Sequence, residues 1–148
     1  MLVNAAGYGK IGNVSDIDLK EQCGMVESEL YSTHQNDRNL PAICCRKAAG
    51  LSIWLRSASF CAQPGFCVYA ASKAYVLRFS QGLAAELKKR GILVTAVCPG
   101  PVRIRILDRA GALAASEKEA LCAEPEAVVT QHLQTACVEE AFRYMEQQ

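Results

Sequence analysis

Residues 68–102 read VYAASKAYVLRFSQGLAAELKKRGILVTAVCPGPV, and this stretch decides the fold. Apolar side chains recur in it at intervals of three and four residues, at Val76, Phe79, Leu83 and Leu87. That period is typical of a helix with one buried face, and we predict the helix over residues 69–90, ended by Gly91. The run ILVTAVC at 92–98 is almost entirely apolar, as in a strand covered on both faces of a parallel sheet.

Tyr69 and Lys73 stand four residues apart near the start of this helix, so their side chains are expected on one face. A phenol titrates near pH ~10, and an adjacent cation favours its ionised form. The pair therefore predicts proton transfer, with Lys73 lowering the pKa of Tyr69. The same spacing also arises by chance on the polar side of an amphipathic helix. Small neighbours, Ala70 among them, leave room for a flat ligand and favour the first interpretation.

Several motifs together resemble the short-chain dehydrogenase/reductase family. They are YAASK at 69–73, the long helix after it, GILVTAVCPG at 91–100 and PGPV at 99–102. The segment LVNAAG at 2–7 is similar to the family's NNAG-type strand end. The resemblance implies that Tyr69 is the catalytic acid/base and that Lys73 lowers its pKa and contacts the nicotinamide ribose. It implies an α/β fold, a partial Rossmann-type doubly wound parallel sheet, as one domain over residues 1–148.

The resemblance also implies a nicotinamide cofactor, NAD or NADP. The positions that it assigns to cofactor binding are Asn4, Ala5, Ala6, Gly7, Tyr69, Lys73, Pro99, Gly100 and Val102. The family's first βαβ unit, which holds the glycine-rich phosphate loop at a helix N-terminus, has no counterpart in these residues. We therefore expect weak or absent dinucleotide binding.

Two family positions carry unexpected residues. The family's catalytic serine lies thirteen residues before the tyrosine, where this chain has Arg56, followed by Ser57. Because a strand residue displaced by one points to the opposite face, Ser57 can serve as the catalytic serine only if the backbone bulges. The asparagine that continues the family's proton relay is replaced by Glu29, and a carboxylate cannot be assumed to act as an amide there.

The sequence GYGKIG at 7–12 matches the pattern GxGxxG. A dinucleotide fingerprint needs a full strand before the glycines and a helix that opens among them. Here only residues 1–3 read as strand, and the next helix is predicted over 16–30, with Ser15 or Asp16 as its N-cap. We therefore interpret 7–12 as a loop.

Beyond Leu30, two segments complete the predicted secondary structure. Residues 31–50 lose all periodicity and are predicted to be irregular, with His34 solvated. Residues 51–55 resume strand character, and Pro125 is expected in the first turn of a last helix running toward residue 144. The predicted apolar face of the 16–30 helix comprises Ile17, Leu19, Cys23, Val26 and Leu30.

After the PGPV turn, the family's threonine is replaced by Ile104. Arg103, Arg105 and Arg109 are consistent with an anion patch, although arginines in a loop more often form a solvated face, which we favour. Residues 110–123 are helix-prone, and the resemblance suggests a substrate lid there.

Composition sets further limits. A net charge of +1 over 148 residues leaves no basic stripe for nucleic acid. The sequence contains neither an apolar run of ~18 residues nor a charged-then-apolar leader, so we expect no membrane contact and a cytoplasmic location. Eight cysteines raise the alternatives of disulfides or a metal, but the absence of CxxC favours reduced thiols and no metal site.

Two functions from different classes remain. The first is an oxidoreductase that moves a hydride between NAD(P)H and a small carbonyl or alcohol substrate, with Ser57 as the nearby hydroxyl donor. The second is a catalytically inactive, truncated remnant of the family. Such a remnant would act at most as a self-association module, a homo-oligomer formed through the 69–90 helix.

Overall fold

The computed structural model describes residues 2–37, 50–90, 92–100, 102 and 123–136. Its elements in chain order are β1 (Leu2–Asn4), α1 (Leu19–Asp37), β2 (Gly50–Trp54), the 3-10 turn η1 (Ser57–Ser59), α3 (Cys67–Lys88), β3 (Leu93–Val97) and α6 (Pro125–Ala136).

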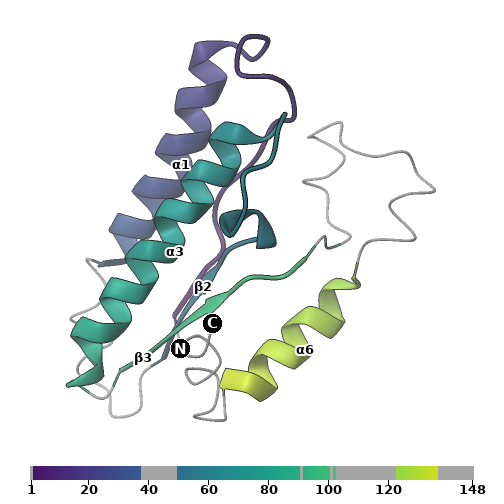
Figure 1. Ribbon diagram of the computed structural model, residues 1–148. Helices are drawn as coiled ribbons and strands as arrows, with labels where there is room; N and C mark the ends of the chain where they lie inside the picture. Colours follow the sequence, from purple (N-terminus) through teal and green to yellow (C-terminus); the bar gives the residue numbers. More distant parts are fainter. Residues whose placement is uncertain (1, 38–49, 91, 101, 103–122, 137–148) are drawn as a thin grey trace.

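The three strands form one parallel sheet in the order β1-β2-β3. The chain moves across this sheet in one direction, from β1 through α1 to β2 and from β2 through α3 to β3. Because such crossovers are almost always right-handed, both helices are placed on the same face. Figure 1 shows α1 and α3 side by side on that face, with α6 on the other side of the sheet. The expected α/β fold with a Rossmann-type parallel sheet is confirmed.

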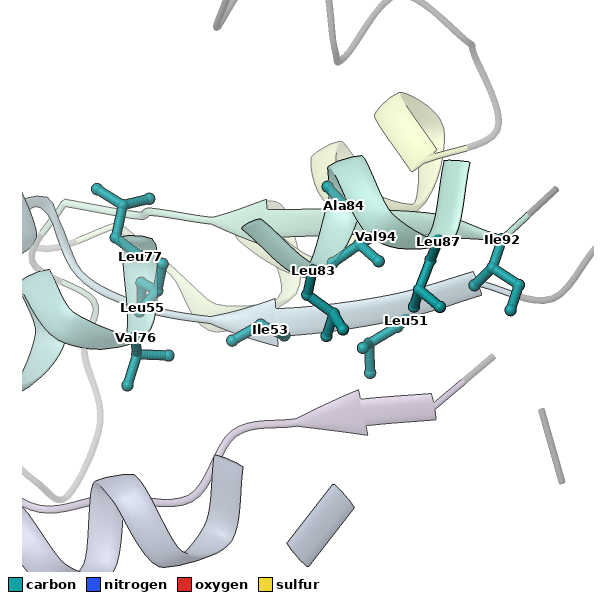
Figure 2. Packing of buried hydrophobic residues seen from close by; sticks show 10 residues of the cluster. All are labelled: Leu51, Ile53, Leu55, Val76, Leu77, Leu83, Ala84, Leu87, Ile92 and Val94. Carbon is teal, nitrogen blue, oxygen red and sulfur yellow. The ribbon is translucent and has the colours of Figure 1, made fainter. Parts of the chain in front are cut away.

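The apolar core lies between α3 and the sheet (Figure 2). Successive side chains of a strand point to opposite faces, and on β2 the side chains of Leu51 and Ile53 face α3. The ten buried residues of this cluster are Leu51, Ile53, Leu55, Val76, Leu77, Leu83, Ala84, Leu87, Ile92 and Val94. The predicted apolar stripe of α3 is therefore confirmed, and Phe79 packs against its margin.

On the opposite face of β2, the sheet contacts α6 through polar side chains. Ser52 points away from α3, and its hydroxyl lies 3.0 Å from Nε2 of His132 on α6. The ring of Trp54 meets the His132 ring edge-on, with 5.6 Å between centroids. Burial lowers the pKa of His132, so the imidazole is held in its neutral form where it meets the sheet.

Helix α1 differs from the prediction at both ends. It begins at Leu19 rather than at residue 16, and the carboxylate of Asp18, not of Ser15 or Asp16, caps it by accepting the Lys20 N–H at 3.2 Å. It continues to Asp37, so the prediction of irregular structure is wrong for residues 31–37. The remainder of that segment, 38–49, lies outside the described residues.

The buried face of α1 is also not the predicted one. Leu19 is 71% exposed and Val26 36% exposed, whereas the residues that turn inward are Met25, Glu29 and Thr33, spaced four apart. A face that includes a carboxylate and a hydroxyl gives little apolar periodicity, which explains why the sequence pattern did not identify it. Helix α1 is therefore held in place by individual contacts of these inward side chains, such as that of Glu29 with Lys73, rather than by a continuous apolar stripe.

The other strand boundaries and those of α3 agree with the predictions to within a few residues, and α6 begins at Pro125 as expected. The predicted course of the last helix toward residue 144, the arginine patch, Ile104 and all but Ala123 of the predicted lid at 110–123 fall outside the described residues. Val102 forms an isolated parallel bridge with Ala123. Within the described part of the chain, no helix has the length and apolar character to cross a bilayer.

Candidate functional site

The site lies where the carboxyl ends of the three strands meet the first turns of α3. After β1, the chain brings Gly9 against the ring of Tyr69. The approach is so close that a Cβ added to Gly9 would lie 2.8 Å from that ring. The chain leaving β2 enters η1, and the Ser57 N–H donates to the Pro99 carbonyl at 2.9 Å, just past β3. The carboxyl edge of a parallel sheet is the usual place for a ligand site in such folds.

Tyr69 and Lys73 occupy one face of α3, as predicted. Both are almost fully buried, at 4% and 5% exposure. The Lys73 ammonium lies 5.5 Å from the centroid of the Tyr69 ring, over its face. One turn of helix thus places an amine against a phenol.

Lys73 makes its ion pair with Glu29 of α1. Its Nζ lies 2.6 Å from Glu29 Oε1, and Glu29 is only 2% exposed. Sequence reasoning marked Glu29 as a departure from the family but did not pair it with Lys73. The signal was available, since a lysine on a buried helix face needs a charged partner. What the sequence does not show is which of the 15 acidic residues supplies it.

The pKa of Tyr69 moves opposite to the expectation. Burial raises it from 10.0 to about 12, Arg56 acts to lower it, and the Glu29 carboxylate raises it further. The predicted lowering by Lys73 is therefore wrong for this arrangement, because the ammonium charge is offset by the carboxylate that it contacts. Burial likewise raises the pKa of Glu29, against the opposing effect of Lys73. At neutral pH Tyr69 is a protonated phenol.

Glycines let the 7–12 loop approach these side chains. Gly7 has a φ of +132° and lies so close to the Glu29 carboxylate that a Cβ there would overlap it. The loop also ties itself to α1, where the Lys10 N–H approaches Met25 Sδ at 3.2 Å and Lys10 Nζ lies 3.8 Å from the Glu21 carboxylate. The loop interpretation of GYGKIG is confirmed, because α1 opens only at Leu19, well after the glycines.

Ser57 lies in η1 at the same edge and is exposed. Because β2 ends at Trp54, Ser57 does not lie on a strand, and the expectation that it needs a bulge within β2 does not apply. The neighbouring Ser59 is buried and its hydroxyl donates to the Arg56 carbonyl at 2.6 Å. The assignment of Ser57 as the catalytic hydroxyl stays a prediction.

The strand-end residues that the resemblance assigns to cofactor binding differ in their exposure. Ala5, Ala6 and Gly100 are small and exposed, and a Cβ on Gly100 would meet nothing within 4 Å. Asn4 is buried, with its side-chain oxygen accepting the Ala6 N–H at 3.4 Å. Of the other assigned positions, Gly7 and Pro99 are half-buried and Val102 is buried. The small side chains at 5, 6 and 100 thus leave backbone exposed at the carboxyl edge of the sheet, and the assignment of these positions to cofactor binding stays a prediction.

The described cysteines, Cys23, Cys61, Cys67 and Cys98, are free thiols. Only Cys98 is partly buried, and burial raises its pKa. Among the described residues, no group of three or more His, Cys, Asp or Glu side chains is arranged to hold a metal ion.

Comparison with known proteins assigns the family. Residues 1–112 match the family model for short chain dehydrogenase. The chain belongs to the short-chain dehydrogenase family. It is 31% identical over 108 residues to the uncharacterized oxidoreductase YbbO of Escherichia coli, and 29% identical over 105 residues to the oxidoreductase UcpA of Salmonella typhimurium. These matches cover 72% and 70% of this chain but only 40% of each relative, so the chain spans about two fifths of their length.

Solved structures agree on the fold. A short-chain dehydrogenase from Sphingobium yanoikuyae, solved in complex with NADPH, is 26% identical with a TM-score of 0.79, and the match covers 89% of this chain and 51% of that one. A short chain dehydrogenase from Salmonella enterica superposes with a TM-score of 0.80 at 23% identity, covering 94% and 57%. The partial Rossmann-type fold is thus shared with enzymes about twice as long.

Proposed function

We propose that this chain carries the catalytic part of an NAD(P)-dependent oxidoreductase that acts on a small carbonyl or alcohol substrate. The observation that carries the proposal is the placement of Tyr69 and Lys73, one helical turn apart and in contact, where the three strands end. Membership of the family and the NADPH complex of a structural relative support a nicotinamide cofactor.

In this function Tyr69 exchanges the hydroxyl proton of the substrate. When bound, the cofactor supplies or accepts the hydride. Ser57 is the hydroxyl that we assign to polarising the substrate oxygen. Lys73 and the exposed edge formed by Ala5, Ala6 and Gly100 would hold the nicotinamide ribose and ring, with Asn4 keeping the end of β1 in place.

The first test is cofactor binding. Titration of the protein with NADH and with NADPH, followed by nicotinamide fluorescence, should give a saturable signal below about 1 mM, within the usual range of enzyme affinities. No saturation with either cofactor would rule out the enzymatic function for this chain and leave only the second candidate below.

The second test separates Tyr69 from the other tyrosines. Tyr69→Phe removes the proton donor and should lower the rate by about 10²–10⁴-fold, the usual contribution of general acid–base catalysis. Tyr75→Phe removes the same hydroxyl from the same helix, but Tyr75 is 42% exposed on the outer face and should leave the rate unchanged. Equal rates in wild type and Tyr69→Phe would contradict the assignment of the acid/base.

One observation favours self-association as the second candidate function. Tyr31 of α1 and Tyr75 of α3 are 63% and 42% exposed, and His34, one turn after Tyr31, places its Nε2 3.0 Å from the Tyr75 hydroxyl. Aromatic side chains exposed together are enriched at protein interfaces. Sedimentation velocity should then show a dimer in wild type and a monomer in Tyr31→Ser/Tyr75→Ser. A wild-type monomer at all concentrations would exclude it.

A further inference from the structure

Glu29 occupies an unusual position for a carboxylate. It is 2% exposed, its ionic partner among the described residues is Lys73 at 2.6 Å, and the Gly7 backbone approaches it so closely that a Cβ at Gly7 would overlap the carboxylate. Among the described residues, Oε1 has no hydrogen-bond donor other than that ammonium. A buried carboxylate held in this way neutralises the amine beside it.

Because Lys73 also lies over the Tyr69 ring, the charge of Glu29 reaches the phenol. The charged groups that act on Tyr69 come from three elements: Arg56 from the turn after β2, Glu29 from α1 and Lys73 from α3. Phe66, whose ring centroid lies 4.6 Å from that of Tyr69, and the Gly9 backbone also pack against this ring and carry no charge. With the ammonium compensated, ionisation of the phenol loses the stabilisation that a free cation would provide.

We propose that Glu29 is a positioning residue which, by binding Lys73 and offsetting its charge, keeps Tyr69 a neutral proton donor for the reduction of a carbonyl substrate. The inference rests on the proposed function and specifies the protonation state in which Tyr69 acts. The carbonyl carbon takes a hydride from NAD(P)H, which becomes NAD(P)⁺, and the carbonyl oxygen takes the proton of the Tyr69 hydroxyl. The resulting phenolate then regains a proton from solvent.

The reverse reaction places the opposite demand on the site. Oxidation of an alcohol needs Tyr69 as a phenolate that can accept the hydroxyl proton, and a pKa of about 12 leaves that form scarce at neutral pH. In the alkaline range where a phenol titrates, Glu29 is ionised and opposes the phenolate most strongly. Removing the carboxylate charge should therefore lower the pH at which the phenolate form of Tyr69, and with it alcohol oxidation, becomes appreciable.

The experiment uses Glu29→Gln, which keeps the shape of the side chain and removes its charge. Tyrosine ring Cζ resonances in protein labelled with ¹³C-tyrosine report each ionisation, and Tyr69→Phe identifies the Tyr69 signal. The Tyr69 midpoint should fall by about 1 pH unit or more in Glu29→Gln, the size expected for an uncompensated cation nearby. Glu27→Gln, the same substitution at an exposed position of α1, should leave it in place.

Activity provides a second readout. In Glu29→Gln the pH profile of alcohol oxidation should shift to lower pH by the same amount, with kcat rather than KM affected, and Glu29→Asp should restore the wild-type profile. An unchanged Tyr69 midpoint in Glu29→Gln would overturn the inference. If Glu29→Gln does not fold, Glu29→Met, which fills the same space without charge, is titrated instead, with the same expected and contradicting results.

The two proposals fail separately. A chain that binds no nicotinamide loses the proposed function, but the resonance titration still shows whether Glu29 controls Tyr69. An active chain whose Tyr69 midpoint is the same in wild type and Glu29→Gln retains the function and loses the inference about Glu29. A Tyr69 midpoint that falls in Glu29→Gln supports the inference in either case.

Discussion

The two halves of α3 are built on different principles. The second half, from Val76 to Leu87, buries leucines and valines against the sheet (Figure 2). The first half buries Tyr69, Lys73 and the hydroxyl of Ser72, which donates to the Tyr69 carbonyl at 2.8 Å. One continuous helix thus joins a stretch held by apolar area alone to a stretch in which a buried ion pair is added to a small apolar cluster. Apolar packing is non-directional, whereas a buried charge depends on a single partner.

Breaking the charge pair should have the largest effect. Lys73→Met leaves the Glu29 carboxylate buried without a cation and should lower the free energy of unfolding by about 3–5 kcal/mol. Glu29→Met/Lys73→Met removes both charges and should recover most of that loss. Urea unfolding measures both variants. Equal losses in the single and double variants would contradict the view that pairing, rather than shape, holds the first half of α3.

Apolar packing in the second half should show the next largest effect. Leu87 is 5% exposed within the core cluster, so Leu87→Ala should cost about 2–5 kcal/mol of unfolding free energy through lost contacts and a cavity. Leu19→Ala is the matched control, because Leu19 is 71% exposed and the change should stay within about 0.5 kcal/mol. A similar loss of unfolding free energy in both variants would contradict the view that Leu87 is held in a packed core and Leu19 is not.

Dependence on pH should distinguish the halves further. Burial raises the pKa of Glu29 above 4.5, so the folded state holds that proton more tightly than the unfolded state. The stability contributed by this group is then largest below pH 4.5 and is lost as the pH rises through the folded pKa. Glu29→Gln should lack this component, while Leu87→Ala should lower the whole curve without changing its shape. Unfolding free energies measured across the acidic range decide the point.

The smallest expected change in stability accompanies the largest loss of activity. Tyr69→Phe removes one hydroxyl and keeps the ring packed against Phe66. Its free energy of unfolding should change by less than about 1 kcal/mol. Thermal unfolding alongside the rate measurement tests this. A large loss of stability would mean that Tyr69 is structural rather than chemical.

Sequence reasoning succeeded where a single element contained its own signal. The helix at 67–88 repeats its apolar residues with the helical period and ends in basic residues before Gly91, so local pattern and tertiary packing agree. The strand at 93–97 was recognisable because a buried parallel strand is apolar on both faces. The pair Tyr69 and Lys73 followed from helical spacing alone.

The wrong predictions for α1, those of its buried face and of its end, share one physical cause. The inward face of α1 is Met25, Glu29 and Thr33, of which Glu29 pairs with the distant Lys73 and Thr33 donates its hydroxyl hydrogen bond to the Glu29 carbonyl. Helix α1 likewise continues to Asp37 without apolar periodicity, where His34 contacts Tyr75 and Phe79 of α3. Periodicity detects burial of apolar groups only, so a helix held by polar contacts escapes it.

By itself the sequence determined the family, the order of the strands and helices, and the placement of a phenol and an amine on one helical face. These depend on spacing within single segments. Only the tertiary structure decided which charge the amine meets, because Glu29 reaches Lys73 across the packing of α1 on α3. The ionisation of Tyr69 follows from that distant contact, since burial and the nearby carboxylate, not the four-residue spacing, set the cost of forming a phenolate.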